Sequence, residues 1–191
     1  MVSDLSQTVP LVSFAKRERS KDIRAVAISG SPRTPSKSKA LAELLLEALA
    51  ARGCSTQLID LATLDSEALL ARREDAGVSA AIAAIGGAQI VVAATPTYRA
   101  LYTGLLKCFF DLMPQAHLAG KVCVPVQTAG VPHHALSIEY GLRPLFASLD
   151  GLPIAGVYAT DAEFADGAAN AELRGRIERA AEQAVGMVAG L

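Results

Sequence analysis

Residues 24–38 read RAVAISGSPRTPSKS, a short apolar run that passes directly into a loop of glycine, serine, proline and basic residues. The run favours a β-strand, and the segment behind the loop has the spacing of an amphipathic helix. Its apolar positions recur at intervals of three and four residues, at Leu41, Leu44, Leu45, Ala48 and Leu49, and Gly53 ends the pattern. A strand, a loop and a helix in this order form the repeating unit of a parallel sheet.

Further β-rich runs occupy residues 55–61, 89–95, 121–128 and 152–160. Segments of helical period separate these runs, and the right-handed crossover rule leaves few ways to connect them. The prediction is an α/β fold, a flavodoxin-like three-layer sandwich with a five-stranded parallel sheet of order 2-1-3-4-5 and helices on both faces.

Two later helices carry stripes that we interpret as core rather than as functional sites. In the helix after the third strand, the expected buried positions are Leu105, Phe109, Leu112 and Met113. In the C-terminal helix, the expected buried positions are Leu173, Ile177, Ala180, Ala181, Ala184 and Val188. The charged residues between them, Arg174, Glu178, Arg179 and Glu182, are expected to face solvent.

Composition narrows the classes of protein to which the chain can belong. It has 191 residues, 51% of them hydrophobic, and a formal net charge of −1, which allows one full core and argues against bulk attraction to nucleic acid. Neither a membrane span nor a signal peptide is visible, so we expect a cytoplasmic protein. Residues 1–23 are expected to form an extension, and residues 24–191 a single domain.

The three cysteines, Cys54, Cys108 and Cys123, are widely spaced and form no C-x-x-C pair. We interpret them as reduced thiols and predict no metal site.

The loop after the first strand is the strongest candidate for a binding site, because its backbone N–H groups and the positive helix end point into the crevice of such a sheet. Ser31, Ser36 and Ser38 supply hydroxyls and Arg33 supplies a fixed charge, which suits a terminal phosphate. No G-x-G-x-x-G and no G-K-[ST] is present, so a monophosphate fits better than a dinucleotide or nucleoside triphosphate. The alternative is an ordinary capped helix start with an incidental arginine.

Two other strand ends are expected to meet this loop. The third strand runs into residues 95–98, where Pro96 and Tyr98 are suited to a flat ring. The fourth strand runs into residues 127–134, where Gly130 permits close backbone approach. Three strand ends would then converge on one crevice.

Taken together, these residues resemble the NADPH-dependent FMN reductase family, whose first loop reads G-S-x-R-x-x-S, as in residues 30–36. In particular the chain resembles the flavin reductases of two-component alkanesulfonate and methanesulfonate monooxygenases. Those proteins carry P-x-Y-[KR] and Y-[ST]-G-x-L-K, matched here by PTYRALYTGLLK, and later features matched by TAG, HH and EYGLRP. The resemblance runs from about residue 24 to at least residue 160.

The resemblance implies roles for individual residues. The FMN phosphate would be held by Ser31, Arg33, Ser36 and Ser38. The flavin would lie beside Pro96, Thr97, Tyr98 and Arg99, with Thr128, Ala129 and Gly130 at the polar edge of the ring. Ala129 stands where the family often has glycine, so backbone approach there is expected to be less open. His134 matches a histidine of the family, and a structural role for it is favoured.

The segment HHALSIEYGLRPLFASLD, residues 133–150, cannot form a regular helix. Pro144 has no N–H for the carbonyl of Tyr140, and Gly141 loosens the same turn, so we predict a kink or a single π-turn there. The resemblance implies a π-turn at a tetramer interface near the flavin, in which Tyr140 would tune flavin retention. The alternative is a proline kink with a surface tyrosine.

The resulting hypothesis is an NAD(P)H-dependent FMN reductase that passes hydride from NADPH or NADH to FMN and supplies reduced flavin to a partner monooxygenase. It would be a homo-tetramer or homo-dimer, and it needs no catalytic acid, base or nucleophile because the flavin supplies the reactivity. One alternative uses bound FMN to reduce quinones, azo dyes or metal oxyanions. A flavodoxin-type electron carrier is less favoured, because such carriers are usually strongly acidic and often hold the ring with tryptophan, which this chain lacks.

Overall fold

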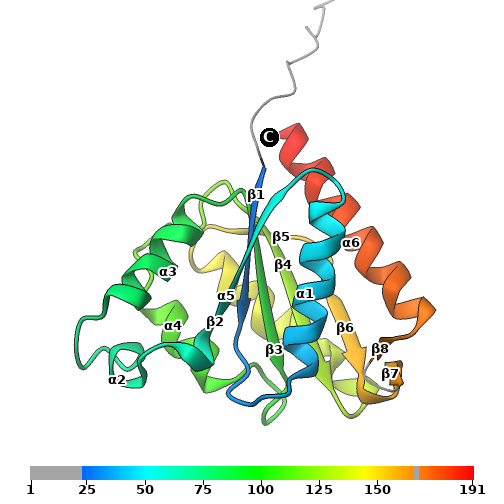
Figure 1. The fold of residues 1–191 in the computed structure, drawn as a ribbon, viewed down its shortest axis with the longest axis horizontal. Coiled ribbons are helices and arrows are strands. Elements are labelled where there is room, and N and C mark those ends of the chain that lie inside the picture. Colours follow the sequence, from blue (N-terminus) through cyan, green and yellow to red (C-terminus); the bar gives the residue numbers. More distant parts are fainter. Residues whose placement is uncertain (1–22, 166–167) are drawn as a thin grey trace, which may run out of the picture.

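The computed structural model describes residues 23–165 and 168–191, so the extension predicted for residues 1–23 lies almost entirely outside the described residues. Figure 1 shows the order of the elements along the chain. The strands are β1 Arg24–Ser29, β2 Ser55–Asp60, β3 Ile90–Pro96, β4 Val122–Ala129, β5 Leu152–Pro153, β6 Val157–Thr160, β7 Phe164–Ala165 and β8 Ala168–Ala169. The α-helices are α1 Lys37–Ala50, α2 Ser66–Leu69, α3 Ala76–Gly86, α4 Gly104–Asp111, α5 Arg143–Ala147 and α6 Ala171–Gly190.

The main sheet is parallel, with the order β2-β1-β3-β4-β5 and with β6 also paired to β4 (Figure 1). This is the predicted order 2-1-3-4-5, with the switch point between β1 and β3. β1 and β3 are buried along nearly their whole length, as central strands covered on both faces require.

The fifth strand differs from the prediction of one continuous run over residues 152–160, because it is divided into β5 and β6. Val122 pairs with Leu152 and Val126 pairs with Val157, so one more residue lies between the pairs on the fifth strand than on β4. β4 carries Pro125 at this point, and proline has no N–H for the ladder. At Gly156 a β-carbon would lie 2.3 Å from the carbonyl oxygen of Pro125, so only glycine allows this close approach.

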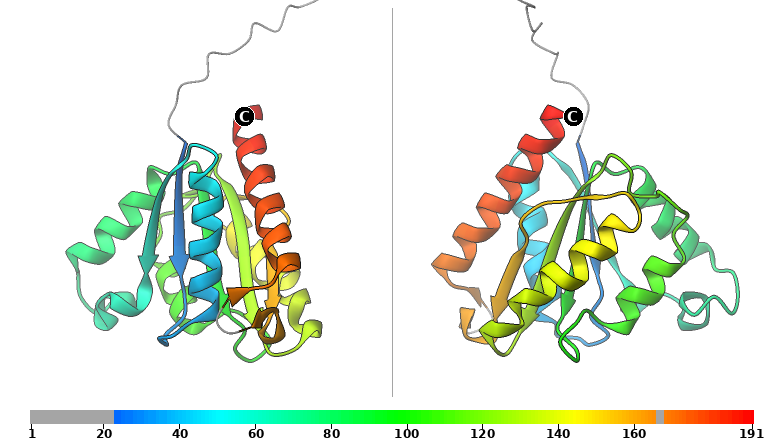
Figure 2. Two further views of the ribbon diagram at one scale, coloured as in Figure 1. Left: turned by 45° about the vertical axis from the view of Figure 1, so that its right-hand side comes forward. Right: turned by 180° about the vertical axis from the view of Figure 1, so that it is seen from behind.

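Helices cover both faces of the sheet, as predicted (Figure 2). α1 and α6 pack on the face formed by the alternate side chains that include Ala25, Val92 and Val124. α3, α4 and α5 pack on the opposite face, which includes Val26, Val91 and the thiol of Cys123. The molecule is therefore a three-layer sandwich with a hydrophobic core on each side of the sheet.

The predicted core stripe of α1 holds except that Leu44 is half-buried, and that of α6 holds except that Val188 is half-buried. The stripe predicted for α4 is partly wrong, because Leu106 and Phe110 are buried together with Phe109, whereas Leu105 and Leu112 are only half-buried. α4 packs against both the sheet and its neighbouring helix, and the Phe110 ring meets the ring of Phe146 in α5 edge-on with centroids 5.9 Å apart. Because α4 has two neighbours, the sheet and α5, two rows of its side chains are buried.

The irregular turn predicted from Pro144 is a π-helix over Ile138–Leu142 that leads directly into α5. The N–H of Arg143 bonds the carbonyl of Ile138, five residues back, which is the π-helical pattern. Within the described parts of the chain, no helix combines the length and the apolar character that a membrane span requires.

Candidate functional site at the carboxyl end of the sheet

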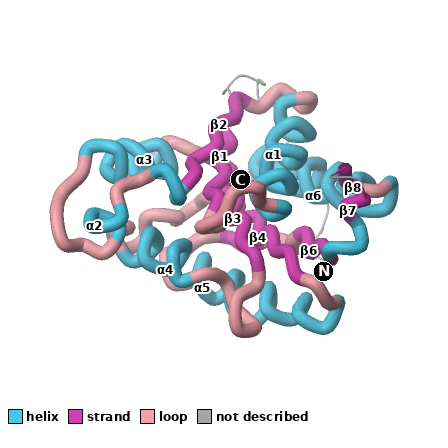
Figure 3. The backbone as a smooth tube through the Cα atoms, turned by 60° about the horizontal axis from the view of Figure 1, so that its bottom comes forward, coloured by secondary structure: helices cyan, strands magenta, loops and turns pink. Residues whose placement is uncertain are grey.

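Three loops leave the same edge of the sheet, seen from that end in Figure 3. They follow β1, β3 and β4 and comprise residues 30–36, 97–103 and 130–137. In an open parallel sheet, ligands bind at this edge, beside the point where the strand order reverses. The predicted site residues therefore lie on neighbouring loops of one edge.

The first loop is tied together by its own serines. Ser36 caps α1, and its hydroxyl oxygen accepts a hydrogen bond from the backbone N–H of Lys39 at 3.2 Å. The hydroxyls of Ser36 and Ser38 lie 3.0 Å apart, and Ser31 accepts from the N–H of Arg33 at 3.3 Å. Ser31 and Ser38 are nearly buried, at 4% and 1% exposed. The loop is thus organised before any ligand arrives.

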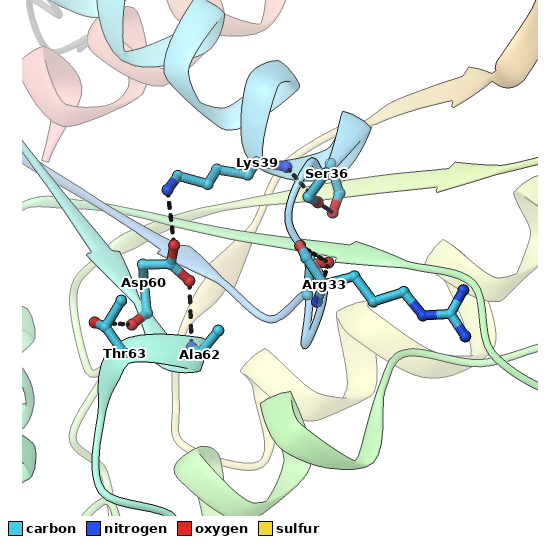
Figure 4. A network of polar contacts seen from close by, with 8 residues as sticks. Arg33, Ser36, Lys39, Asp60, Ala62 and Thr63 are labelled. Atoms are coloured by element: carbon cyan, nitrogen blue, oxygen red, sulfur yellow. Dashed lines mark hydrogen bonds and ion pairs between the residues drawn. The ribbon is translucent and has the colours of Figure 1, made fainter.

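Arg33 is exposed and turns toward the second loop. Its guanidinium carbon lies 5.8 Å from the centre of the Tyr98 ring, within the range of a cation–π contact. Figure 4 shows its side chain extending away from Lys39. The contact joins the candidate phosphate loop to the loop that carries the aromatic side chain.

The two neighbouring lysines are occupied by carboxylates. Lys39 Nζ lies 2.7 Å from a carboxylate oxygen of Asp60, which raises the pKa of Lys39 (Figure 4). Lys37 Nζ lies 2.9 Å from Asp161, which follows β6. Among residues 23–165 and 168–191, Arg33 has no such carboxylate partner. The guanidinium is therefore the cation of this segment that remains available to an anion.

The second loop is a tight hairpin. Tyr98 and Leu101 exchange backbone hydrogen bonds of 2.8 and 3.1 Å. Arg99 and Ala100 between them both have positive φ angles, 50° and 64°, the combination found in type I′ turns. Non-glycine residues adopt this conformation at a conformational cost, and such costs are concentrated at functional sites.

Two contacts attach this hairpin to its neighbours. At its base, the N–H of Thr97 donates to the carbonyl of Thr128 at 2.7 Å, which joins the second loop to the third. At its tip, the hydroxyl of Tyr140 donates to the carbonyl of Ala100 at 2.6 Å, although 55% of Tyr140 is exposed. A β-carbon at Gly141 would lie 2.6 Å from Leu101, so the π-helix packs directly on the hairpin.

Thr103 is a structural residue of the site that the sequence argument missed. Its hydroxyl donates to the carbonyl of Gly30 at 2.6 Å and accepts the N–H of Leu106 at 3.2 Å. It therefore caps α4 and fixes the start of the first loop at the same time. A threonine directly before a helical run is a recognisable N-cap signal that identifies the first role but not the second.

The third loop is more open. Thr128 is buried, Ala129 is half-buried and Gly130 is exposed. A β-carbon at Gly130 would have only the carboxylate of Asp161 nearby, at 3.8 Å. The ring of His134 packs edge-on against the ring of His133, with centroids 4.8 Å apart, and no hydrogen bond of the His134 ring is present within residues 23–165 and 168–191.

The side chains of this site are suited to binding a ligand rather than to nucleophilic catalysis. It combines hydroxyls, the N-terminus of a 14-residue helix and a free guanidinium with an exposed tyrosine ring, donors that suit a flat ligand with a phosphate tail. Among the residues that the structure describes, no three metal-ligating side chains gather. The residues present therefore fit FMN.

Comparisons with known proteins agree with this reading. The family model for NADPH-dependent FMN reductase matches residues 23–166. The NADH-dependent FMN reductase SfnF of Pseudomonas fluorescens (strain Pf0-1) is 38% identical over 172 residues, which cover 86% of this chain and 91% of that protein. The FMN reductase (NADPH) of Escherichia coli (strain K12) is 34% identical over 146 residues, covering 75% and 76% of the two chains.

Solved structures give the same result. The apo form of the NADH:FMN oxidoreductase EMOB superposes with a TM-score of 0.81 at 34% identity, covering 88% of this chain and 90% of that one. A Streptococcus flavodoxin, at 15% identity and a TM-score of 0.59, covers 86% and 98% of the two chains and shares the fold alone. On the family match and the two relatives, this chain belongs to the NADPH-dependent FMN reductase family.

Proposed function

We propose that this protein is an NAD(P)H-dependent FMN reductase that moves hydride from a reduced nicotinamide to FMN. The observation that carries the proposal is the contact between Arg33 and Tyr98, which brings a free cation on a serine-lined helix start beside an exposed aromatic ring. Family membership supports the same activity, and the relatives are named for both NADH and NADPH.

The FMN would be held by residues from all three loops. The phosphate would bind at the first loop, to Ser31, Arg33, Ser36 and Ser38. The ring would lie beside Pro96 at the end of β3 and Thr97, Tyr98 and Arg99 of the second loop. Its polar edge would lie at Thr128, Ala129 and Gly130. Since Ser31 and Ser38 are nearly buried, we expect Arg33, Ser36 and backbone N–H groups to make the outermost phosphate contacts.

Bound FMN supplies the hydride acceptor, so the protein's own residues need only bind and orient two flat rings. No acid–base or nucleophilic group is required in this scheme. The hairpin is suited to orientation because it is fixed at its base by Thr128 and at its tip by Tyr140.

We further propose that the protein acts in the cytoplasm and that FMN leaves, once reduced, for a separate flavin-dependent monooxygenase. The exposure of Arg33, Tyr98 and Gly130 supports an open site from which flavin exchanges. We also propose a homo-dimer or homo-tetramer that uses the π-helix. Leu136 just before it and Tyr140 within it are 66% and 55% exposed, which leaves apolar surface that a second subunit could cover.

A steady-state assay tests the activity. Oxidation of NADH and NADPH is followed without acceptor, with added FMN and with a quinone. Turnover that requires added FMN supports the proposal. Turnover that requires the quinone while flavin stays bound identifies the quinone-type reductase instead, and absence of turnover with tight FMN binding identifies an electron carrier.

Two variants test the assembly at the π-helix. Tyr140→Ala removes the ring and the bond to Ala100, whereas Tyr140→Phe removes only the bond. We expect Tyr140→Ala to elute later than the native protein in size-exclusion chromatography and to retain less flavin, with Tyr140→Phe close to native size. Native size and native flavin retention for Tyr140→Ala would contradict the role of this residue.

A further inference from the structure

A buried amide lies under the hairpin. Gln127 belongs to β4, is paired in register with Thr95 of β3, and has no exposed surface. Its side-chain Nε2 donates to the hydroxyl oxygen of Thr97 at 2.9 Å. Its Oε1 has no hydrogen-bond partner among the residues that the structure describes. A buried polar atom without a partner lowers stability, so such an amide calls for a reason other than stability.

The contact of Gln127 reaches the start of the hairpin. Thr97 is half-buried, and its backbone N–H is bound to the carbonyl of Thr128, the residue next to Gln127. Thr97 is also followed directly by Tyr98, whose ring meets Arg33. One buried side chain thus fixes the residue at which the core, the hairpin and the candidate flavin site meet.

The bond also determines the direction in which the Thr97 hydroxyl donates. Because the amide N–H occupies a lone pair of the threonine oxygen, the hydroxyl hydrogen must point elsewhere. Within residues 23–165 and 168–191 that hydroxyl has no acceptor. FMN carries ring carbonyls, ring nitrogens and ribityl oxygens, all of which accept hydrogen bonds.

We propose that Gln127 is a positioning residue for flavin binding, which holds the Thr97 hydroxyl as a donor to FMN and fixes the base of the hairpin. The proposal rests on the proposed function, since it concerns the same site. Gln127 acts through Thr97 and does not itself touch the flavin. The unpartnered oxygen of its amide lowers the stability of the fold, which a positioning role explains and a purely structural role does not.

The test is a double-mutant cycle on FMN affinity. Gln127→Met keeps the length of the side chain and removes both polar atoms, and Thr97→Val removes the hydroxyl at nearly constant shape. We expect each variant to bind FMN about tenfold more weakly, the loss of one ordinary hydrogen bond, and the double variant to be no weaker than either single one. Thr97→Ser retains the hydroxyl and should keep native affinity.

Ser29→Ala is the matched control, because Ser29 is also fully buried at a strand end with an unpartnered hydroxyl but makes no hydrogen bond to the hairpin among the described residues. It should bind FMN as the native protein does. Thermal unfolding separates positioning from structure, because Gln127→Met should unfold at the native temperature or above it.

The outcomes separate the two proposals. If the native protein does not bind FMN, the proposed function fails. If the native protein binds FMN and the effects of Gln127→Met and Thr97→Val are absent or simply additive, only the role of Gln127 fails. A Gln127→Met protein that is less stable but binds FMN normally also overturns it, since that result describes a purely structural amide.

Discussion

The two ends of the sheet treat their polar groups differently. At the amino end, Lys121 Nζ donates to the carbonyls of Gly86 and Ala88 at 2.7 and 2.9 Å, and a ring nitrogen of His117 lies 3.0 Å from the carbonyl of Ile82. At the carboxyl end, the buried side-chain oxygens of Ser29 and Gln127 lack partners among the described residues. The polar side chains at the amino end hydrogen-bond backbone carbonyls, whereas two buried polar side chains at the carboxyl end have an oxygen without a partner among the described residues.

This difference shows how one fold serves two purposes. Satisfied polar groups stabilise a connection, whereas a buried polar group without a partner lowers stability and an exposed charge stays available to a ligand. The free guanidinium of Arg33, at the carboxyl end, follows the same division. Substitution of the polar side chains at the amino end should therefore change stability, whereas substitution of Arg33, Thr97 or Gln127 at the carboxyl end should change flavin binding.

The largest effect is expected for Arg33→Ala. Loss of a charge-assisted contact with phosphate, roughly 1.5 to 3 kcal/mol, should weaken FMN binding by about 10- to 100-fold. Stability should hardly change, because Arg33 is exposed. Isothermal titration calorimetry with FMN and with riboflavin, which has no phosphate, measures the effect, and the variant should prefer FMN to riboflavin less strongly than the native protein does.

Arg179→Ala is the control, since Arg179 is exposed on α6. It should bind FMN with native affinity. If Arg33→Ala also binds FMN with native affinity, the phosphate does not bind Arg33 in the first loop as proposed.

A smaller effect, on stability rather than on FMN binding, is expected for Lys121→Met. The variant leaves two carbonyls at the amino end without their shared donor. We expect the free energy of unfolding to fall by about 1 kcal/mol, as measured by urea denaturation. FMN affinity should stay native. A loss of FMN affinity without a loss of stability would contradict the assignment of stability to the amino end and flavin binding to the carboxyl end.

The smallest effect concerns thiol reactivity. Burial raises the pKa of Cys123, near the start of β4, from 9.0 to about 12, while Cys108 in α4 is half-buried. Labelling with iodoacetamide at about pH 8 should therefore modify Cys108 in the folded protein and Cys123 only after unfolding. Peptide mass spectrometry distinguishes the two sites. Rapid labelling of Cys123 in the native protein would show that its thiol is not shielded from solvent at the amino end of the sheet.

The same shift gives a pH dependence. The folded state opposes ionisation of Cys123, so its contribution to stability is complete below pH 9.0 and is lost as the pH rises toward about 12. In Cys123→Ala the free energy of unfolding should fall less steeply above pH 9.0 than in the native protein. Equal slopes would mean that the thiol ionises freely in the fold.

Much of the fold could be predicted because its signals are local. Hydrophobic period identified the strands and most buried positions of α1 and α6. The missing N–H of Pro144 predicted a kink or a π-turn at Tyr140, where the structure has a π-helix. The buried positions of α4 were partly mispredicted, because that helix contacts two neighbours and a single stripe describes only one of them.

In the candidate site, too, local features could be predicted from the sequence and contacts between distant residues could not. The loop residues Ser31, Arg33, Ser36 and Ser38 were identified from sequence, since a strand, a loop and a capped helix are consecutive in the chain. The sequence analysis also assigned the charge to Arg33, but it did not show that Lys37 and Lys39 are each paired with a carboxylate from another strand end.

By itself, the sequence determined the capped loop and the irregular helix, because each depends on residues within a few positions of one another. The crossover rule extended the local strand and helix signals to the order of the strands. Only the tertiary structure decided the division of the fifth strand opposite Pro125 and the bond between Gln127 and Thr97, which are 30 positions apart. Such contacts depend on which distant side chains the packed sheet brings together, and hydrophobic period carries no information about that.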